Sequence, residues 1–197
     1  GDGAVGDWFG RRVAISGDTA IVGSDRDDHT GVMEAGSAYV FVRTGATWVA
    51  QQKLVASDAN AGDHFGGSVA IEGDTCIVGS RSDDHAGVVR AGSAYVFVRT
   101  GGTWVEQQKL VTSNAAGDDV MGFSVGITGD TAFCGAPGQG AGGSVYEFVR
   151  VGTTWMEQQR LVASGSHTFG SSVSVSGETV VIGDPGGTPF SGSAYVF

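Results

Sequence analysis

The sequence is poor in lysine, cysteine and proline, and it has no long apolar run. Lys53 and Lys109 are its only lysines, and 11 basic residues stand against 21 acidic ones, for a formal net charge of -10. A surface of that sign repels phosphate backbones and anionic lipid heads, so we expect no nucleic-acid partner. No stretch of 18 apolar residues occurs, so we expect no membrane insertion either.

Glycine is the residue that the sequence has in excess, with 35 among 197 residues. Such a content disfavours a helical protein, because glycine weakens helices and favours turns. The hydrophobic share of 41% is ordinary for a globular protein. We therefore predict a folded, turn-rich chain rather than a disordered one.

Four internal repeats organise the chain. The first landmark is a Phe-Gly pair, found at Phe9-Gly10, Phe65-Gly66, Met121-Gly122 and Phe169-Gly170. The second is Gly-Asp-Thr at 17–19, 73–75 and 129–131, with Gly-Glu-Thr at 177–179, and the third is Ser-Ala-Tyr-Val-Phe or a close variant at 37–41, 93–97, 144–148 and 193–197. One repeat domain results, with units at about 7–62, 63–118, 119–166 and 167–197.

Each unit is predicted to form short antiparallel strands, placed in the first unit at 9–15, 19–23, 38–43 and 48–55. The innermost strand alternates bulky residues on one side with small ones on the other. Units that bury a bulky face against the small face of a neighbour are typical of β-propeller blades. We predict an all-β propeller of three complete units plus one incomplete unit, with an open solenoid or a sandwich as the alternatives.

The repeated Phe-Gly pairs, together with Gly135-Ala136-Pro137, resemble the FG-GAP repeats that build the propeller of integrin alpha subunits and of many bacterial extracellular proteins. The likeness is greatest to bacterial-style repeats, although Met121 replaces a phenylalanine. It implies an extracellular or cell-surface location and a non-catalytic role in binding, adhesion or scaffolding. The alternatives are a structural repeat that self-assembles into a larger ring or polymer, and a hydrolase or lyase that uses the loop face.

The most polar connections follow the second strand in the first two units, and they supply the candidate ligand-binding residues. These are Asp25, Asp27, Asp28 and His29, with Asp83, Asp84 and His85 in the second unit. Carboxylates beside an imidazole can bind a divalent cation or a ligand. The two sets occupy equivalent places, whereas catalytic groups usually converge from non-equivalent ones. Solvated acidic loops are the first expectation, a cation or ligand contact the second, and no catalytic residue is predicted.

No cofactor and no metal site are predicted. Integrin-type repeats often hold calcium between the first and second strands, but here that connection is a short turn such as Gly17-Asp18, too short to wrap a cation. If calcium binds, we expect it at the 25–28 and 83–84 loops. His64 has no nucleophile near it in the sequence and is expected to be structural.

Two further residue types have expected positions. Trp48, Trp104 and Trp155 recur at one place in the outer strand, which favours packing over stacking on a sugar. Cys76 and Cys134 lie on the same face of neighbouring second strands, so they should not meet across one interface. We predict two buried free thiols.

The partner of the chain is left open by the sequence. A protein or a carbohydrate ligand fits a propeller of this type. The fourth unit stops before its outermost strand, so the open blade faces suggest a homo-oligomer, missing blades supplied by the rest of a longer chain, or an incomplete arc. We favour a fragment or an assembly over a bare arc.

Overall fold

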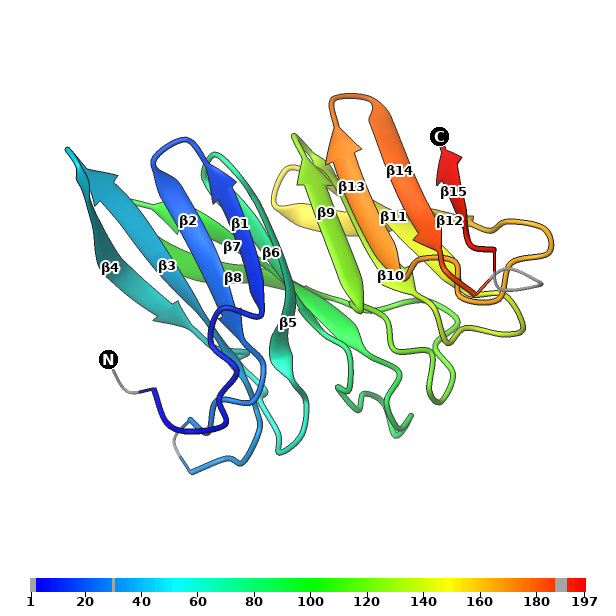
Figure 1. Ribbon diagram of the computed structural model, residues 1–197, viewed down its shortest axis with the longest axis horizontal. Coiled ribbons are helices and arrows are strands. Elements are labelled where there is room, and N and C mark those ends of the chain that lie inside the picture. The colour runs from blue at the N-terminus through cyan, green and yellow to red at the C-terminus, as the bar shows by residue number, and fades with distance from the viewer. Residues whose placement is uncertain (1–2, 30, 187–190) are drawn as a thin grey trace.

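The computed structural model describes residues 3–29, 31–186 and 191–197, which form strands and turns without a helix (Figure 1). Accordingly, this part of the chain contains no helix of the length and apolar character needed to cross a bilayer. The prediction of an all-β fold is confirmed.

The strands form four antiparallel sheets in the described residues, named here blades 1 to 4. Blade 1 contains β1 (Arg12–Ser16), β2 (Thr19–Ser24), β3 (Ser37–Thr44) and β4 (Thr47–Leu54). Blade 2 contains β5 (Phe65–Glu72), β6 (Thr75–Ser80), β7 (Ser93–Thr100) and β8 (Thr103–Leu110). Blade 3 contains β9 (Ser124–Thr128), β10 (Thr131–Ala136), β11 (Ser144–Val151) and β12 (Thr154–Leu161). Blade 4 contains β13 (Ser172–Ser176), β14 (Thr179–Asp184) and β15 (Ser193–Val196).

Strands within a blade pair in chain order, from an innermost to an outermost strand. Each sheet lies inside one predicted unit, and over the described residues the fourth sheet has three strands. The prediction of a β-propeller with three complete units and one incomplete unit is therefore confirmed.

One predicted strand boundary is wrong. In blade 1 the innermost strand begins at Arg12 and not at Phe9, because the chain turns at Gly10, whose φ is 88°. In blade 2 the strand does begin at the equivalent Phe65, but its pairing shifts register between Phe65 and Ser68. The Phe-Gly landmark is thus a turn or bulge that leads into the innermost strand.

The predicted tight hairpins between the first two strands are confirmed, and in blades 1 to 3 an arginine side chain holds the turn. Asp18 in the β1–β2 turn accepts a hydrogen bond from Nε of Arg43 at 2.7 Å. The same bond recurs at 2.7 Å between Asp74 and Arg99 and between Asp130 and Arg150. The aspartates of these turns are therefore engaged with arginines of the third strand.

The blades stack side by side in chain order, because β1, β5, β9 and β13 contact one another in turn (Figure 1). We call the side of a blade that carries the Phe-Gly aromatic its bulky face, and the side that carries Gly23 and Ala38 or their counterparts its small face. Between blades 1 and 2, Phe65, Tyr95 and Phe97 of the bulky face pack in one buried cluster with the small face of blade 1. The predicted stacking of bulky on small faces is confirmed.

Backbones of adjacent blades approach closely at several glycines in each joint. A Cβ atom added to Gly23 would overlap the carbonyl oxygen of Gly66, and one added to Gly79 would overlap that of Gly122. The Ser68 hydroxyl donates to the same Gly122 oxygen at 2.7 Å. Glycine is required there because no side chain fits between the blades.

Tryptophan and cysteine occupy the predicted places in these joints. Gln52 donates from Nε2 to the backbone oxygen of Trp104 at 2.7 Å and accepts its backbone N–H at 2.8 Å, and Gln51 accepts the indole N–H at 3.0 Å. Trp104 and Trp155 are buried, which confirms their packing role, whereas Trp48 of blade 1 is exposed. Cys76 and Cys134 are buried free thiols in successive joints, as predicted.

Candidate functional site

The acidic loops are mostly buried, so the expectation that they are solvated is wrong for three of their carboxylates. Asp27 and Asp83 are buried, and each pairs with a lysine of the outermost strand of its own blade, at 2.8 Å from Lys53 and from Lys109. Burial opposes the charge of Lys109, but hydrogen bonds to Asp58 and Asp83 outweigh it and raise the pKa of Lys109. These ion pairs hold each acidic loop against its own blade.

Asp25 joins two blades. Its buried carboxylate lies 3.2 Å from Nη1 of Arg11 in blade 1 and 2.8 Å from Nη1 of Arg81 in blade 2. Two guanidinium groups offset the cost of burying one carboxylate. Asp25 therefore acts as a bridge between blades.

The remaining predicted ligand-binding residues shape the loop turns. Asp28 accepts the backbone N–H of Glu34 at 2.7 Å, and Asp84 accepts that of Arg90 at 2.7 Å. His29 and His85 each form an isolated β-bridge to a valine three residues further on. Among the described residues, no three His, Cys, Asp or Glu side chains gather in a group that could hold a metal ion.

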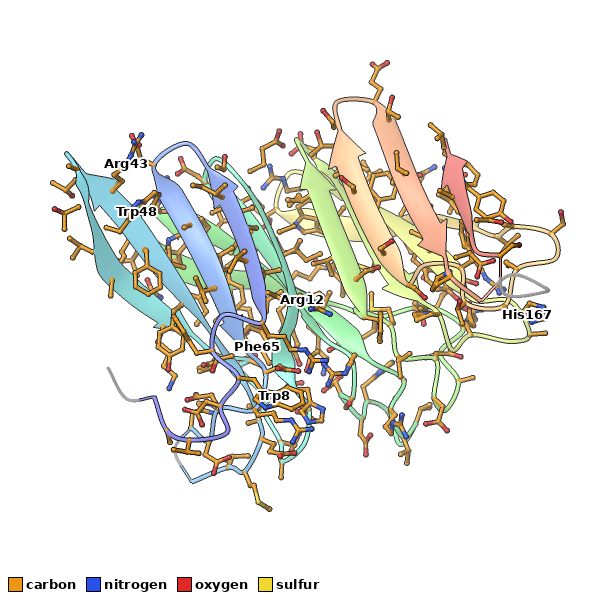
Figure 2. All side chains as sticks on the ribbon, viewed as in Figure 1. Trp8, Arg12, Arg43, Trp48, Phe65 and His167 are labelled. Atoms are coloured by element: carbon orange, nitrogen blue, oxygen red, sulfur yellow. The ribbon has the colours of Figure 1, made fainter. Side chains whose placement is uncertain are left out.

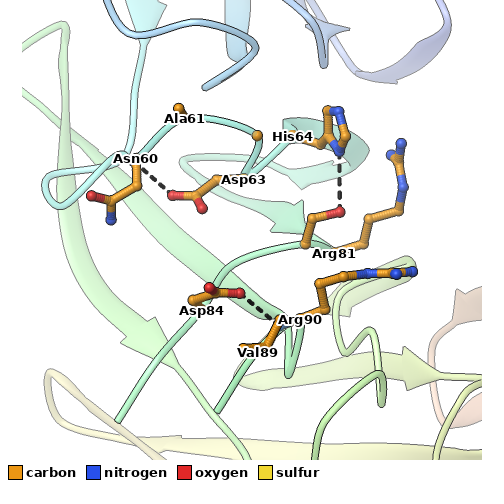
Figure 3. Close-up of a pocket in the computed structure, with 10 residues that line it drawn as sticks. Asn60, Ala61, Asp63, His64, Arg81, Asp84, Val89 and Arg90 are labelled. Atoms are coloured by element: carbon orange, nitrogen blue, oxygen red, sulfur yellow. Dashed lines mark hydrogen bonds between the residues drawn. The ribbon is translucent and has the colours of Figure 1, made fainter. Parts of the chain in front are cut away.

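A cleft of about 750 Å³ opens on the loop side of the joint between blades 1 and 2 (Figure 3). One wall is the connection 60–64 that leads into β5, and the other is the loop that follows β6. Side chains of both walls reach the cleft: Asn60, Asp63, His64, Arg81, Ser82, Asp84 and Arg90. Of the predicted site residues, only Asp84 lines it.

His64 stands at the centre of a polar chain along this cleft. Its Nδ1 lies 3.1 Å from Oγ of Ser82, and its Nε2 lies 3.4 Å from a carboxylate oxygen of Glu34 (Figure 3 shows the first contact). Burial, followed by the charge of nearby Arg81, lowers the pKa of His64 below its ordinary value. A serine hydroxyl thus does lie against His64, which the sequence expectation of a structural histidine did not include.

The carboxyl group of Asp63 lies beside His64 at the base of the same wall. It accepts the backbone N–H of Asn60 at 2.7 Å, and burial raises its pKa to about 6. Asp119 makes the same bond to the backbone of Ala116 in blade 3. This turn is therefore a structural element of the repeat. It positions the cleft residues that do not recur in the other repeats.

Trp8 extends the polar network at the loop face (Figure 2). The guanidinium carbon of Arg26 lies 3.8 Å from the centre of its ring, and that of Arg11 lies 4.5 Å away. Arg26 also pairs with Glu34 at 3.3 Å, which connects Trp8 to the His64 chain. Stacking of this kind holds arginines in fixed positions at a protein surface.

Sequence reasoning missed Trp8, Glu34 and Arg90, but the sequence carries a signal for them. Trp8 takes the place in its repeat that His64 takes in the next, and Glu34 takes the place of Arg90. Positions that differ between otherwise equal repeats are not needed for the blade itself. Such departures could have identified the cleft.

A second cavity, of about 270 Å³, lies among the innermost strands or their entries and is lined by Arg12 with residues of all three other blades. Arg12 therefore borders the space between the innermost strands. Arg11 instead turns to Asp25 and Trp8.

The fold and the repeated contacts between blades define the class of protein. It is a β-propeller domain in which Phe-Gly turns lead into the innermost strands of the blades. The chain belongs to the FG-GAP repeat family, whose model matches residues 1–41, 48–97, 104–148 and 155–197. No curated protein sequence matches it. The resemblance drawn from the Phe-Gly pairs is confirmed.

Solved propeller structures resemble the chain in fold alone. TolB from Acinetobacter baumannii superposes with a TM-score of 0.54 at 10% identity, over 94% of this chain and 42% of that one. A mutant Aleuria aurantia lectin in complex with alpha-methyl-L-fucoside superposes with a TM-score of 0.54 at 9% identity, over 90% of this chain and 51% of that one. The chain therefore spans about half the length of these proteins or less.

Proposed function

We propose that the chain is a non-catalytic binding or adhesion module, displayed outside the cell or on its surface, and that the cleft between blades 1 and 2 is its ligand site. The observation that carries this proposal is the gathering of non-repeated polar side chains at one cleft of the loop face. The extracellular location rests on the use that the FG-GAP family makes of such propellers.

The size of the cleft supports a small polar ligand or a single side chain of a partner. Its volume of about 750 Å³ lies within the usual range for ligand pockets, roughly 300–1,000 Å³. Arg90 is exposed at its edge, and its contact with the exposed Asp118 at 3.2 Å costs little to exchange for another anion.

The chemistry of the walls favours a carboxylate. Arg81 is already fixed by Asp25, whereas Arg90 can turn its planar guanidinium toward a new oxygen pair. The side chains of Asn60 and Ser82 add neutral hydrogen-bonding groups on both walls. The ligand class is therefore a carboxylate-bearing group, supplied by an acidic sugar or by an acidic side chain of a protein.

Binding to immobilised uronic-acid glycans and to acidic peptides tests the proposal and distinguishes the two sources. We expect R90A to weaken binding at least tenfold, because a charge-assisted pair is lost. The matched control is R12A, since Arg12 is also an exposed arginine but lines the other cavity. Equal binding by both variants, or no binding by the wild type to either class, would contradict the proposal.

A second candidate function is ester or amide hydrolysis, and one observation favours it. Ser82, His64 and Glu34 occupy non-equivalent positions of the repeat and form a hydroxyl, imidazole and carboxylate chain. A carboxylate can only accept, so Nε2 of His64 carries the proton and Nδ1 is free to accept the hydroxyl proton of Ser82. In such a step the Ser82 oxygen attacks a carbonyl carbon, its proton passes to Nδ1, and Glu34 stabilises the imidazolium. The imidazolium then protonates the leaving alcohol or amine as its bond to the carbonyl carbon breaks, and water hydrolyses the acyl group from Ser82 with His64 again as the base.

Hydrolysis of a short-chain chromogenic ester separates the two candidates. If Ser82 is catalytic, S82A should abolish turnover while ligand binding persists. The control S113A, which alters an exposed serine of another loop, should retain turnover. Turnover that is equal in wild type and S82A, or absent from both, would leave the binding module as the function.

A further inference from the structure

Arg12 departs from the repeat at a position where serine has a structural task. Serine holds the equivalent place in blades 2 to 4, at positions 68, 124 and 172. The Ser68 hydroxyl donates across a joint to the backbone oxygen of Gly122 at 2.7 Å. The Ser124 hydroxyl makes the same bond to Gly170, also at 2.7 Å. Arginine in blade 1 forgoes this bond, so the needs of the joint do not account for it.

The Arg12 side chain pairs with no carboxylate in the part of the chain that the structure describes. Its one hydrogen bond there runs from Nη1 to the backbone oxygen of Arg11, at 3.2 Å. Arg11 and Arg81 in turn share a single carboxylate, that of Asp25, at 3.2 Å and 2.8 Å. Arg12 thus remains an unneutralised cation in a chain whose net charge is -10.

The second cavity, of about 270 Å³, receives this cation. Figure 2 shows the Arg12 side chain directed toward the middle of the arc of blades, where the cavity lies. The other residues of its wall are serines, one phenylalanine and valines of β5, β9 and β13, and no acidic side chain lines it among the described residues. The cavity shares no residue with the cleft between blades 1 and 2. Its volume is below the usual range of roughly 300–1,000 Å³ for ligand pockets, which suits a small ion.

Backbone groups of three innermost strands face the same cavity. Val69, Val125 and Val173 line it, each in a strand that pairs with a neighbour on one side only. A two-residue hairpin turn closes with a hydrogen-bonded pair, here Ser176 and Thr179, and bonded and unbonded pairs then alternate along the strands. Val173, three positions before Ser176, falls in an unbonded pair, so its N–H and C=O point away from β14. Val69 and Val125 have the same register in their own blades.

We propose that this cavity binds one inorganic phosphate ion, held by the guanidinium group of Arg12 and by the backbone N–H groups of Val69, Val125 and Val173. Arginine presents a planar fork of N–H donors that fits two oxygens of a phosphate. Backbone N–H groups that line a concave site favour an anion as well. The site is separate from the cleft, so its test does not depend on the ligand bound there.

The backbone carbonyl groups at the same three valines favour phosphate over sulfate. Phosphate keeps at least one proton near neutral pH, and this O–H group can donate a hydrogen bond to a carbonyl oxygen. Sulfate has no proton there and can only accept. A carbonyl that faces a sulfate oxygen would therefore be left without a donor, which costs free energy in a partly enclosed site.

The acidic surface of the chain opposes a polyanion but not a single ion in this cavity. A nucleic acid extends over the surface and meets its many carboxylates. At physiological ionic strength, charges further away than about 8 Å are largely screened. Since Arg12 is the charged residue of the cavity wall, it sets the sign of the field inside.

Calorimetric titration with sodium phosphate at pH 7, at an ionic strength held constant with sodium chloride, tests the proposal. We expect one saturable site on the wild type and at least tenfold weaker binding to R12S, because a charge-assisted pair is lost. R12S installs the serine that the other blades carry, so it should fold normally. The matched control is R160S, which should bind like the wild type. Arg160 is also exposed and has a serine hydroxyl as its described partner, but it lies in the outermost strand of blade 3.

Thermal unfolding supplies a second readout, because a ligand that binds only the folded state raises the midpoint of unfolding. Phosphate should raise the midpoint of the wild type and of R160S above its value in chloride of equal ionic strength, and should leave R12S unchanged. Sulfate should have the smaller effect in both measurements. The proposal would be overturned by equal phosphate binding to the wild type and R12S, or by sulfate binding as tight as phosphate binding. A wild type that shows neither saturable binding nor a rise of the midpoint would overturn it as well.

Discussion

Arg99 in β7 of blade 2 donates from Nη1 to Oγ1 of Thr19 in β2 of blade 1, 3.0 Å away. The same guanidinium donates from Nε to Asp74 of its own hairpin at 2.7 Å. A single side chain thus closes a turn and ties two blades together. The recurrence of this arrangement at Arg150 identifies it as a property of the joint.

A double-mutant cycle of R99Q and T19V measures this contact. We expect a coupling of about 0.5–1.5 kcal/mol in the free energy of unfolding, the usual size for a hydrogen bond with one charged partner that is partly exposed. Urea denaturation of the four proteins gives the value. R99Q combined with T131V is the control cycle, since Thr131 lies in blade 3, and its coupling should be near zero.

Substitution of Gly79 tests the close approach of blades. G79A should lower the free energy of unfolding by about 1–3 kcal/mol or more, because the new Cβ overlaps the Gly122 carbonyl and the Ser68 hydroxyl. G183A meets only the equivalent serine side chain, Ser172, and should cost clearly less. Equal losses in the two variants would show that the joint does not require glycine.

The buried carboxyl group of Asp63 makes stability depend on pH. Its pKa is raised in the folded state to about 6 from 3.8, so between these values the folded state holds a proton that the unfolded state has released. Stability from this group therefore falls as pH rises from about 4 to 6 and stays low above that. D63N keeps an acceptor for the Asn60 N–H but cannot ionise.

Chemical denaturation of D63N and wild type at several pH values checks this sign. The stability of D63N relative to wild type should increase by up to about 3 kcal/mol between pH 4 and pH 7, at 1.36 kcal/mol for each pKa unit. A constant difference would mean that Asp63 ionises normally in the folded protein.

The two thiols should be unreactive in the native protein. Burial raises the pKa of Cys76 and of Cys134, so both thiols stay protonated and are poor nucleophiles. Burial also keeps a thiol reagent from reaching them. A thiol reagent should therefore count no free sulfhydryl in the native protein and two after denaturation without reductant. Two sulfhydryls missing from the denatured protein would indicate a disulfide and contradict the described joints.

The sequence alone determined the repeat, the blade and the family. The Phe-Gly, Gly-Asp-Thr and Ser-Ala-Tyr-Val-Phe landmarks recur because every unit meets the same kind of neighbour on each face. Alternation of side chains along a strand then placed the two cysteines in the joints. These features depend on local pattern and spacing, which a sequence displays directly.

Tertiary structure decided the cleft and the fate of the acidic loops. His64 is 18 residues from Ser82 and 30 from Glu34: the folding of blade 2 brings His64 to Ser82, and the stacking of blade 2 on blade 1 brings it to Glu34. From the sequence alone, Asp25, Asp27 and Asp83 are expected to be solvated. In the structure they are buried, and arginines and lysines from elsewhere in the chain neutralise their charge. Charge partners set by the folding of each blade and by the joint between blades determine which polar residues remain available to a ligand.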